Sequence, residues 1–163
     1  MSASRSQEHA TELEVEGAGQ YELIPGQLVR ALVHAEQRGS RSASGQFRQV
    51  TSSVDGAVDI TGAVTCLAVD AVNHRAWIGG TVTKNRSTDP SYRDDPTTQV
   101  GQDVWFRVLD TGKQSADPDR STFLGFAGSA GITTSAEYCA AKIWPADNAR
   151  THPFVTGGLE VEP

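Results

Sequence analysis

The sequence predicts an all-β protein: an antiparallel β-barrel of about eight strands, with a two-sheet β-sandwich as the alternative. Three observations lead to this fold class. Apolar and polar residues alternate with a period of two in many short segments. The 16 glycines and 7 prolines supply frequent turns, and no βαβ alternation is visible. The strands are long and interrupted by glycines, which favours a curled sheet that closes on itself and leaves no exposed edge.

The most regular part of the sequence, residues 57–84, is predicted to form a hairpin of two long strands. One face of its first strand begins with the polar residues Asp59 and Thr61 and ends with the apolar residues Leu67 and Val69. This change suits a strand that enters the core partway along, or a bulge near Gly62 that resets its facing. Gly79 and Gly80 offer no side chain to pack in the second strand. They therefore predict a sharp bend, or room for a large neighbouring ring.

Two segments of this hairpin, residues 62–69 (GAVTCLAV) and 75–82 (RAWIGGTV), resemble the signature of a bacterial family of small, mostly secreted β-rich proteins. The family as a whole has no established activity. The similarity extends over about residues 47–126, with a weaker echo near Cys139 and in the last strand. The resemblance implies an all-β fold and a pairing of Cys66 with Cys139, and it carries over no catalytic residues. The chain departs from the family by lacking an apolar leader, which puts secretion in question.

The other elements of the first half follow from local patterns. Residues 12–16 alternate cleanly, as an edge strand or as a tail that folds over the domain. Residues 27–36 fit either a helical stripe or a strand, and their context favours a strand. A further strand is expected at 46–53, and the pair Asp55-Gly56 predicts a hairpin turn after it.

The second half alternates polar loops with strands. Residues 134–144 fit either a strand or one short helix. The expected loops are residues 85–99, 110–120 and 145–153, and the expected strands are residues 101–109, 121–127 and 154–161.

The length of 163 residues predicts one domain, with residues 20–163 as the barrel and residues 1–19 as a flexible N-terminal tail or lid. The first residues lack the apolar core of a signal peptide, which predicts a cytoplasmic protein. A chain whose leader had been removed would look the same, so secretion stays the alternative. Cys66 and Cys139 would be buried thiols in the cytoplasm and a disulfide outside it.

Composition excludes several classes of partner. The formal net charge of −6 argues against a general affinity for nucleic acid or anionic membranes. No run approaches the roughly 20 apolar residues of a membrane span. The four histidines show no metal-ligand spacing, and no phosphate-binding loop is present, so neither a metal nor another cofactor is expected. The expected partner is a hydrophobic small molecule, and a homodimer is left open.

Aromatic side chains are the candidates for the wall of a ligand site, because an eight-stranded barrel can hold one small ligand in its mouth or lumen. Any single ring is more often ordinary core. Trp77 and Trp105 are the leading candidates, since each lies opposite the more regularly apolar face of its strand. The remaining substrate-binding candidates are Phe47, Phe123 and Trp144.

The candidate catalytic residues are Arg107, Glu137 and Tyr138. If Trp105 and Arg107 point inward together, they form a clamp for a carbonyl, enol or carboxylate group. Glu137 and Tyr138 have side chains of the type that donates or accepts protons. The alternative for a mid-strand charge such as Arg107 is that it faces water, because an unpaired charge inside a barrel would be costly.

Two functions from different classes follow. The first is a cofactor-free cyclase or isomerase that shapes a hydrophobic, polyketide-like natural-product intermediate, by analogy of fold with lipocalin-like barrels and allene oxide cyclases. The second is a non-catalytic secreted binding or structural β-domain stabilised by a disulfide. A barrel whose lumen is filled by side chains, with no cavity of roughly 300 Å³ or more, would exclude the first, a reaction inside a closed aromatic cavity.

Overall fold

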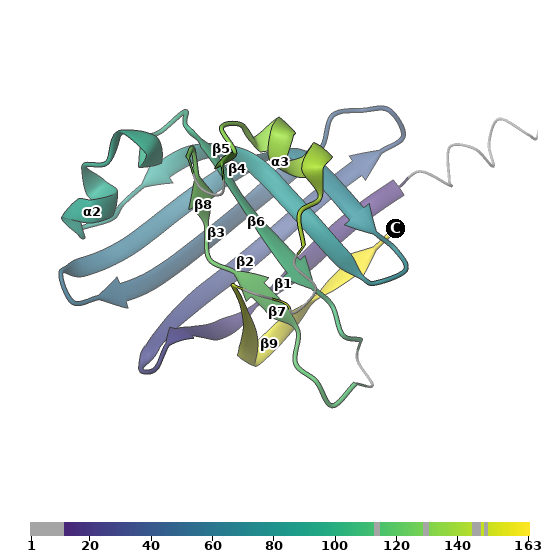
Figure 1. Cartoon of the computed structure of the whole chain (residues 1–163), viewed down its shortest axis with the longest axis horizontal. Coiled ribbons are helices and arrows are strands. Elements are labelled where there is room, and N and C mark those ends of the chain that lie inside the picture. Colours follow the sequence, from purple (N-terminus) through teal and green to yellow (C-terminus); the bar gives the residue numbers. More distant parts are fainter. Residues whose placement is uncertain (1–11, 113–114, 129–130, 145–147, 149) are drawn as a thin grey trace, which may run out of the picture.

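The computed structural model describes residues 12–112, 115–128, 131–144, 148 and 150–163, which form one β-sheet with short helices outside it (Figure 1). The strands described are β1 (Glu12–Ile24), β2 (Gln27–Arg38), β3 (Ser44–Ser53), β4 (Gly56–Asp70), β5 (Arg75–Asn85), β6 (Asp103–Leu109), β7 (Arg120–Thr122), β8 (Gly125–Phe126) and β9 (Thr151–Glu162).

The sheet closes into a barrel because β5 pairs with β6 while β9 joins β1 to β7. The hydrogen-bonded ring runs β1, β2, β3, β4, β5, β6, β7, β9 and back to β1, and every pairing is antiparallel. The two-residue strand β8 pairs with β6 beside β7. The predicted eight-stranded antiparallel barrel is confirmed, and the sandwich alternative is wrong.

Side chains of each strand alternate between the barrel interior and its outer wall. On β6, Val104, Phe106 and Val108 pack into the main core inside the barrel. Trp105 belongs instead to a second apolar cluster on the outer wall, and Arg107 lies on the same side of the strand. The pair that the sequence places on one face therefore points away from the lumen.

A bulge between Val64 and Cys66 resets the facing of β4. Val64 and, after the bulge, Leu67 pack inside the barrel, whereas Cys66 and Ala68 lie in the outer cluster. A further register shift precedes Gly62, where the sequence predicts a bulge. The face of β4 that begins polar becomes apolar because the bulge turns Leu67 and Val69 toward the barrel interior. Cys66 and Ala68, on the other face, then pack in the second cluster on the outer wall.

Two glycines of the hairpin make room for neighbours. A Cβ atom on Gly62 would lie 2.3 Å from Cζ of Phe47, so the glycine gives this ring its space in the core. A Cβ atom on Gly79 would lie 2.6 Å from Sγ of Cys66 and 2.8 Å from Cβ of Ser135. Gly79 therefore lets the helix that begins at Ser135 approach the outer wall.

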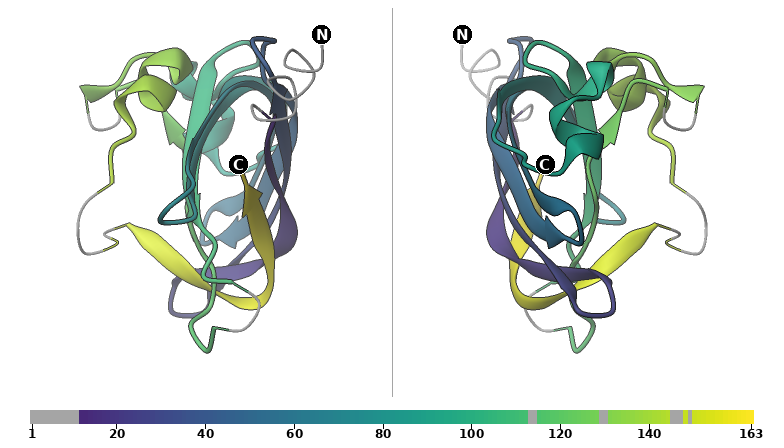
Figure 2. Two further views of the ribbon diagram at one scale, coloured as in Figure 1. Left: turned by 90° about the vertical axis from the view of Figure 1, so that its right-hand side faces the viewer. Right: turned by 90° about the vertical axis from the view of Figure 1, so that its left-hand side faces the viewer.

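The ambiguous segment at 134–144 contains a helix, α3 (Ser135–Ala141), capped by the Thr134 hydroxyl, which accepts the Glu137 N–H at 3.1 Å. Both views in Figure 2 place α3 outside the ring of strands, and it contacts β4, β5 and β6. The Ser135 hydroxyl donates to the Gly80 carbonyl at 2.6 Å and fixes the start of the helix. Within the expected loop at 85–99 lie α2 (Pro90–Arg93) and the 3-10 turn η1 (Pro96–Thr98).

The structure corrects the boundary of the predicted N-terminal tail or lid, residues 1–19. Residues 12–19 belong to β1, which pairs with β2 on one side and β9 on the other. Val15 is fully buried in the core, because the alternating pattern at 12–16 is that of a barrel strand. Residues 1–11 lie outside the described part of the chain. None of the helices described is both long enough and apolar enough to cross a membrane.

Candidate functional site

The barrel interior is a packed core. Tyr21, Phe47 and Ile78 are fully buried there, and the Phe47 ring meets the Phe106 ring edge-on at 5.1 Å between centroids. The hollow that remains beside Phe106 and Phe154 measures about 10 Å³, roughly the space of one water molecule. This part of the interior has no room for an organic ligand, and Phe47 is a core residue in this structure.

A buried hydrogen-bond network crosses the interior. The Tyr21 hydroxyl donates to Gln49 Oε1 at 2.5 Å and lies 3.3 Å from the carbonyl oxygen of Thr122, to which Gln49 Nε2 donates at 3.4 Å. Burial raises the pKa of the Tyr21 phenol far above its ordinary value, so it stays protonated. The network satisfies polar groups that would otherwise be costly inside the barrel.

The candidate site is a cavity of about 250 Å³ between β6, β7, the start of β9 and α3. Trp105 and Tyr138 of the outer cluster bound it on one side, and Leu124 of the main core and His152, which stacks on Tyr21, bound it on the other. We call it the wall pocket. It is bounded by four rings, two guanidinium groups and three smaller or aliphatic residues: Trp105, Phe123, Tyr138, His152, Arg107, Arg150, Thr122, Leu124 and Gly125.

The fold brings these residues together from distant parts of the chain. The alternation of β6 turns Trp105 and Arg107 to the outer wall, and the Arg107 N–H donates to Thr122 Oγ1 of β7 at 3.0 Å. Helix α3 supplies Tyr138, whose ring stacks on that of Trp105 at 5.5 Å and an interplanar angle of 19°. His152 comes from the start of β9, where its ring stacks on Tyr21 at 5.6 Å.

Helix α3 is fastened to the wall by several contacts. A disulfide joins Cys139 of α3 to Cys66 of β4, with 6.2 Å between their Cα atoms. The Trp77 indole N–H donates to the carbonyl oxygen of Ile143 just after the helix, at 2.8 Å. Trp77, Ile132 and Tyr138 are all at most 5% exposed in the outer cluster. These contacts hold the Tyr138 side of the wall pocket in place.

Burial shifts the pKa values of Tyr138 and His152 in the wall pocket. Burial raises the pKa of the Tyr138 phenol to about 12, although the Arg107 guanidinium, which hydrogen-bonds it, acts in the opposite direction. Burial lowers the pKa of the His152 imidazole, and the positive charge of Arg120 lowers it further. At pH 7 the pocket therefore presents a protonated phenol and a neutral imidazole.

Arg107 is the most buried charged side chain of the wall pocket, with 7% of its surface exposed. Its guanidinium carbon lies 5.2 Å from the centroid of the Trp144 ring. Arg75 lies over the same ring at 4.4 Å, and Trp144 Nε1 donates to Asn148 Oδ1 at 2.9 Å. Trp144 thus contacts both guanidinium groups, of which Arg107 lines the pocket.

The structure brings together four of the residues that the sequence singles out: Arg107, Tyr138, Trp105 and Phe123. Trp144 lies next to them through its contact with Arg107. The other candidates lie elsewhere: Glu137, Trp77 and Phe47.

The structure places Glu137, Trp77 and Phe47 outside the wall pocket. Glu137 is exposed on α3, where its carboxylate accepts hydrogen bonds from the backbone and hydroxyl of Thr133 at 3.3 and 3.1 Å. Trp77 is 3% exposed beneath the segment that follows α3, and Phe47 lies inside the barrel. A strand pattern shows which residues share a face, but it does not show which part of that face a helix will cover.

His152 and Arg150 are pocket residues that the sequence does not indicate. Both lie in the expected loop at 145–153, because the last strand begins at Thr151 rather than at Phe154. Extending the alternation of that strand backwards would have placed His152 on it. Only the pairing of β7 with β9 brings His152 to the pocket, where it lies opposite Ser121.

A larger hollow of about 460 Å³ lies on the outer face of β9, β1, β2 and β3. We call it the outer groove. It is bounded by Ala18, Gly19, Gln20, Arg30, Ala31, Leu32, Arg48, Val50, Thr156 and Gly157. None of these bounding residues is aromatic, and the Arg48 guanidinium is held by the Asp59 carboxylate at 2.8 and 3.0 Å. The wall pocket is therefore the better candidate for an organic ligand.

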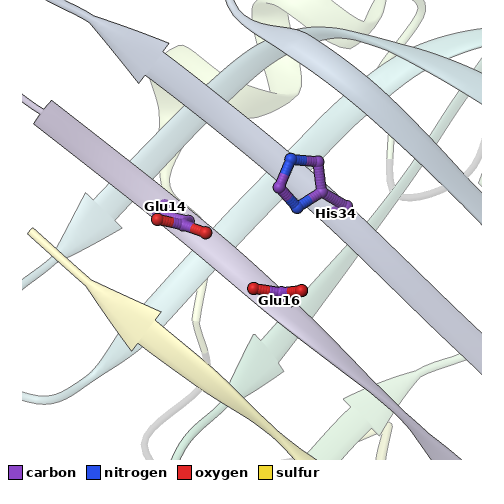
Figure 3. A group of neighbouring side chains, drawn as sticks. All are labelled: Glu14, Glu16 and His34. Atoms are coloured by element: carbon purple, nitrogen blue, oxygen red, sulfur yellow. The ribbon is translucent and has the colours of Figure 1, made fainter.

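A cluster of potential metal ligands lies elsewhere on the outer wall. Figure 3 shows Glu14 and Glu16 of β1 beside His34, and one ligand atom from each lies within 4.8 Å of the others. The antiparallel register sets Glu16 directly opposite His34, a juxtaposition that linear spacing does not reveal. Partial burial raises the pKa of Glu14, and repulsion from Glu16 and Glu162 raises it further. Exposed carboxylates gather in this way without a cation, and we assign no metal to the cluster.

Replacing Glu14 with glutamine is expected to raise Tm at pH 7 by about 1–3 °C, because it removes one of several mutually repelling carboxylates. The raised pKa of Glu14 in the folded state means that its protonation favours folding. Stability therefore falls as the pH rises from the ordinary pKa of Glu14 to the raised one. Thermal unfolding followed by circular dichroism should show the gain at pH 7 and lose it at about pH 3.5.

The control is Glu12→Gln, which removes the same charge from the same strand beside Arg38, whose Nε lies 3.5 Å from Glu12 Oε1. This variant should not gain stability, because it removes an attraction rather than a repulsion. An equal gain in both variants would show that total charge, and not the Glu14 cluster, sets the effect.

No family model matches the chain, and neither a curated protein nor a solved structure matches it. Its function is therefore inferred from the residues of the wall pocket.

Proposed function

We propose that the protein binds a small planar organic molecule in the wall pocket and catalyses a proton-transfer isomerisation or cyclisation of it. The observation that supports this proposal is the convergence of Trp105, Arg107, Tyr138 and His152 on one cavity. Rings that can stack on a ligand and groups that can move a proton meet there, on a site whose helical side is held by a disulfide.

The size of the pocket limits the ligand. Its volume of about 250 Å³ lies just below the roughly 300–1,000 Å³ typical of small-molecule sites. A molecule of one or two fused rings fits this space, and a long polyketide chain would have to leave most of its length outside. The proposed substrate is therefore a small cyclic ketone or enol, or the cyclising end of a longer molecule.

The chemistry follows from the protonation states. A neutral His152 can accept a proton from a carbon next to a carbonyl group. Tyr138, whose pKa is about 12, remains a hydrogen-bond donor, and together with Arg107 it can stabilise the negative charge that develops on the carbonyl oxygen. Deprotonation and reprotonation of carbon in this way require no metal or organic cofactor.

The test uses exchange of carbon-bound hydrogen in a model ketone. Incubation of 2-tetralone with the protein in D₂O should accelerate loss of its α-proton signals in the proton NMR spectrum beyond the rate in buffer. His152→Gln should lower the protein-dependent rate by about 10²-fold or more, because it removes the general base. Phe123→Ala should raise the dissociation constant for 2-tetralone by about 2–12-fold, because one ring of the pocket is lost.

The matched control is His74→Gln, which changes an exposed histidine in the β4–β5 turn. It should leave the exchange rate as in the unmodified protein. If the unmodified protein does not accelerate exchange, or if His152→Gln accelerates it equally, the proposed proton transfer is wrong.

The disulfide favours a second candidate function, a non-catalytic binding domain in an oxidising compartment. Bonds such as Cys66–Cys139 persist in secreted and periplasmic proteins and are rare in the cytoplasm. This function uses the same wall pocket without the proton transfer. Binding of 2-tetralone without any acceleration of exchange would favour it over the isomerase or cyclase, and mass measurement of the protein from its host would show whether the two thiols are joined there.

A further inference from the structure

We propose that the natural ligand of the wall pocket is a planar carboxylate, whose anionic group is held by Arg107 and Arg150. The inference rests on the proposed function, because it names the chemical class of the molecule that the same pocket binds. It goes further by assigning the charge of the ligand and the residues that recognise it.

The charge of the pocket is opposite to that of the protein. The chain carries a formal charge of −6, yet the wall pocket presents two arginines. Among the residues that the structure describes, no aspartate or glutamate lines this cavity. A cavity whose charged lining is cationic attracts an anion and disfavours a cation of the same shape.

Two further arginines reinforce this potential from behind the lining. Arg75 lies over Trp144, the ring that also contacts Arg107. The Arg120 guanidinium donates to the hydroxyl and carbonyl oxygens of Thr151 at 2.8 and 3.0 Å, beside His152. Burial lowers the pKa of the His152 imidazole, and the positive charge of Arg120 lowers it further. The local field thus opposes a further positive charge and favours a negative one.

The lining also fits the shape of a flat acid that carries a ketone or enol group. A guanidinium group offers parallel N–H donors that match the two oxygens of a carboxylate. Trp105 and Tyr138 stack nearly parallel, and Phe123 adds a third ring to the wall. A flat molecule can lie against the half-buried Phe123 ring, beside the stacked pair, while its carboxylate meets the cations.

The experiment compares two probes of nearly the same shape, 2-naphthoate and 2-naphthamide, by isothermal titration calorimetry at pH 7. The carboxylate is expected to bind at least about tenfold more tightly than the amide, because charge-assisted hydrogen bonds are the stronger ones. Arg150→Gln should weaken binding of 2-naphthoate by about tenfold and change binding of 2-naphthamide by less than about twofold. Arg150 is exposed, so this variant is expected to fold.

Arg30→Gln is the matched control, because it removes the same charge from an exposed arginine of the outer groove. It should leave the affinity for both probes unchanged. A second readout is the pKa of His152, followed by NMR and identified by its absence in His152→Gln. Bound 2-naphthoate should raise this pKa, because a nearby negative charge favours the imidazolium ion.

The outcomes separate the inference from the proposed function. Equal affinity for the acid and the amide, or equal losses in Arg150→Gln and Arg30→Gln, would overturn the assignment of a carboxylate while leaving the pocket as a binding site. Failure of both probes to bind, together with no exchange of 2-tetralone, would overturn the pocket itself. Tighter binding of the acid with no rise in the pKa of His152 would place the anion outside the wall pocket and also overturn the inference.

Discussion

Replacing both Cys66 and Cys139 with serine is expected to lower the free energy of unfolding by about 4 kcal/mol. The disulfide closes a loop across 73 residues of sequence, and in the chain-entropy model a cross-link of this length restricts the unfolded chain by about that amount. Urea unfolding followed by tryptophan fluorescence measures the loss, because Trp77 and Trp105 are both buried beside α3.

The same change should weaken the wall pocket, because Cys139 and Tyr138 lie on the same short helix. Without the disulfide, α3 is held by the Ser135 hydrogen bond to Gly80 and by its apolar contacts, so it should detach more often than in the oxidised protein. Hydrogen exchange of the α3 amides should speed up more than that of β2. The affinity for 2-naphthoate should fall at the same time.

A control for this prediction is Ala140→Ser, which changes an exposed position of α3 and should shift stability by less than about 0.5 kcal/mol. If the double variant does not fold, chemical reduction of the folded protein gives the same comparison. Unchanged urea midpoints after complete reduction would show that the disulfide does not stabilise the fold.

Replacing Phe47 with alanine is expected to cost about 3–5 kcal/mol of folding stability, the range for removing a fully buried ring. Phe47 has no exposed surface, fits against Gly62 and meets Phe106 edge-on. The truncated side chain would leave a cavity that strands of a closed barrel cannot readily collapse. Phe47→Leu should cost less, because the cavity is smaller.

Comparison of Phe47 and Phe123 variants also distinguishes a core residue from a residue that lines the wall pocket. Phe123→Ala, at a half-buried ring of the wall pocket, should cost less stability than Phe47→Ala and more ligand affinity. Phe47→Leu, measured well below its Tm, should bind 2-naphthoate like the unmodified protein. A large loss of affinity in Phe47→Leu with little loss of stability would place a ligand inside the barrel.

Much of the barrel could be predicted from local patterns. Alternation identifies the strands, the Asp55-Gly56 pair identifies a turn, and the hairpin at 57–84 is confirmed as β4 and β5. The change of facing along β4 was also visible as a polar face that becomes apolar, although the bulge that causes it lies between Val64 and Cys66 rather than near Gly62. The segment at 134–144 stayed ambiguous, because seven residues of helix are too few to show a clear period.

The candidate site was predictable only in part. Trp105 and Arg107 share a face of β6 by simple alternation, and the sequence singles out both of them. Whether that face lies inside or outside the barrel depends on closure of the sheet, and here it lies outside. His152 was missed because its position depends on the pairing of β7 with β9, between segments about 30 residues apart in the sequence.

The amino-acid sequence by itself determined the strands, their turns and the grouping of Trp105 with Arg107, because these depend on the period of two between neighbouring residues. Tertiary structure alone decided that Phe47 fills the barrel, that α3 covers the outer wall, and that Arg107, Tyr138 and His152 line one cavity. The physical reason is that a cavity is the space left by side chains from many segments. Its place depends on closure, register and packing volume, which no single segment contains.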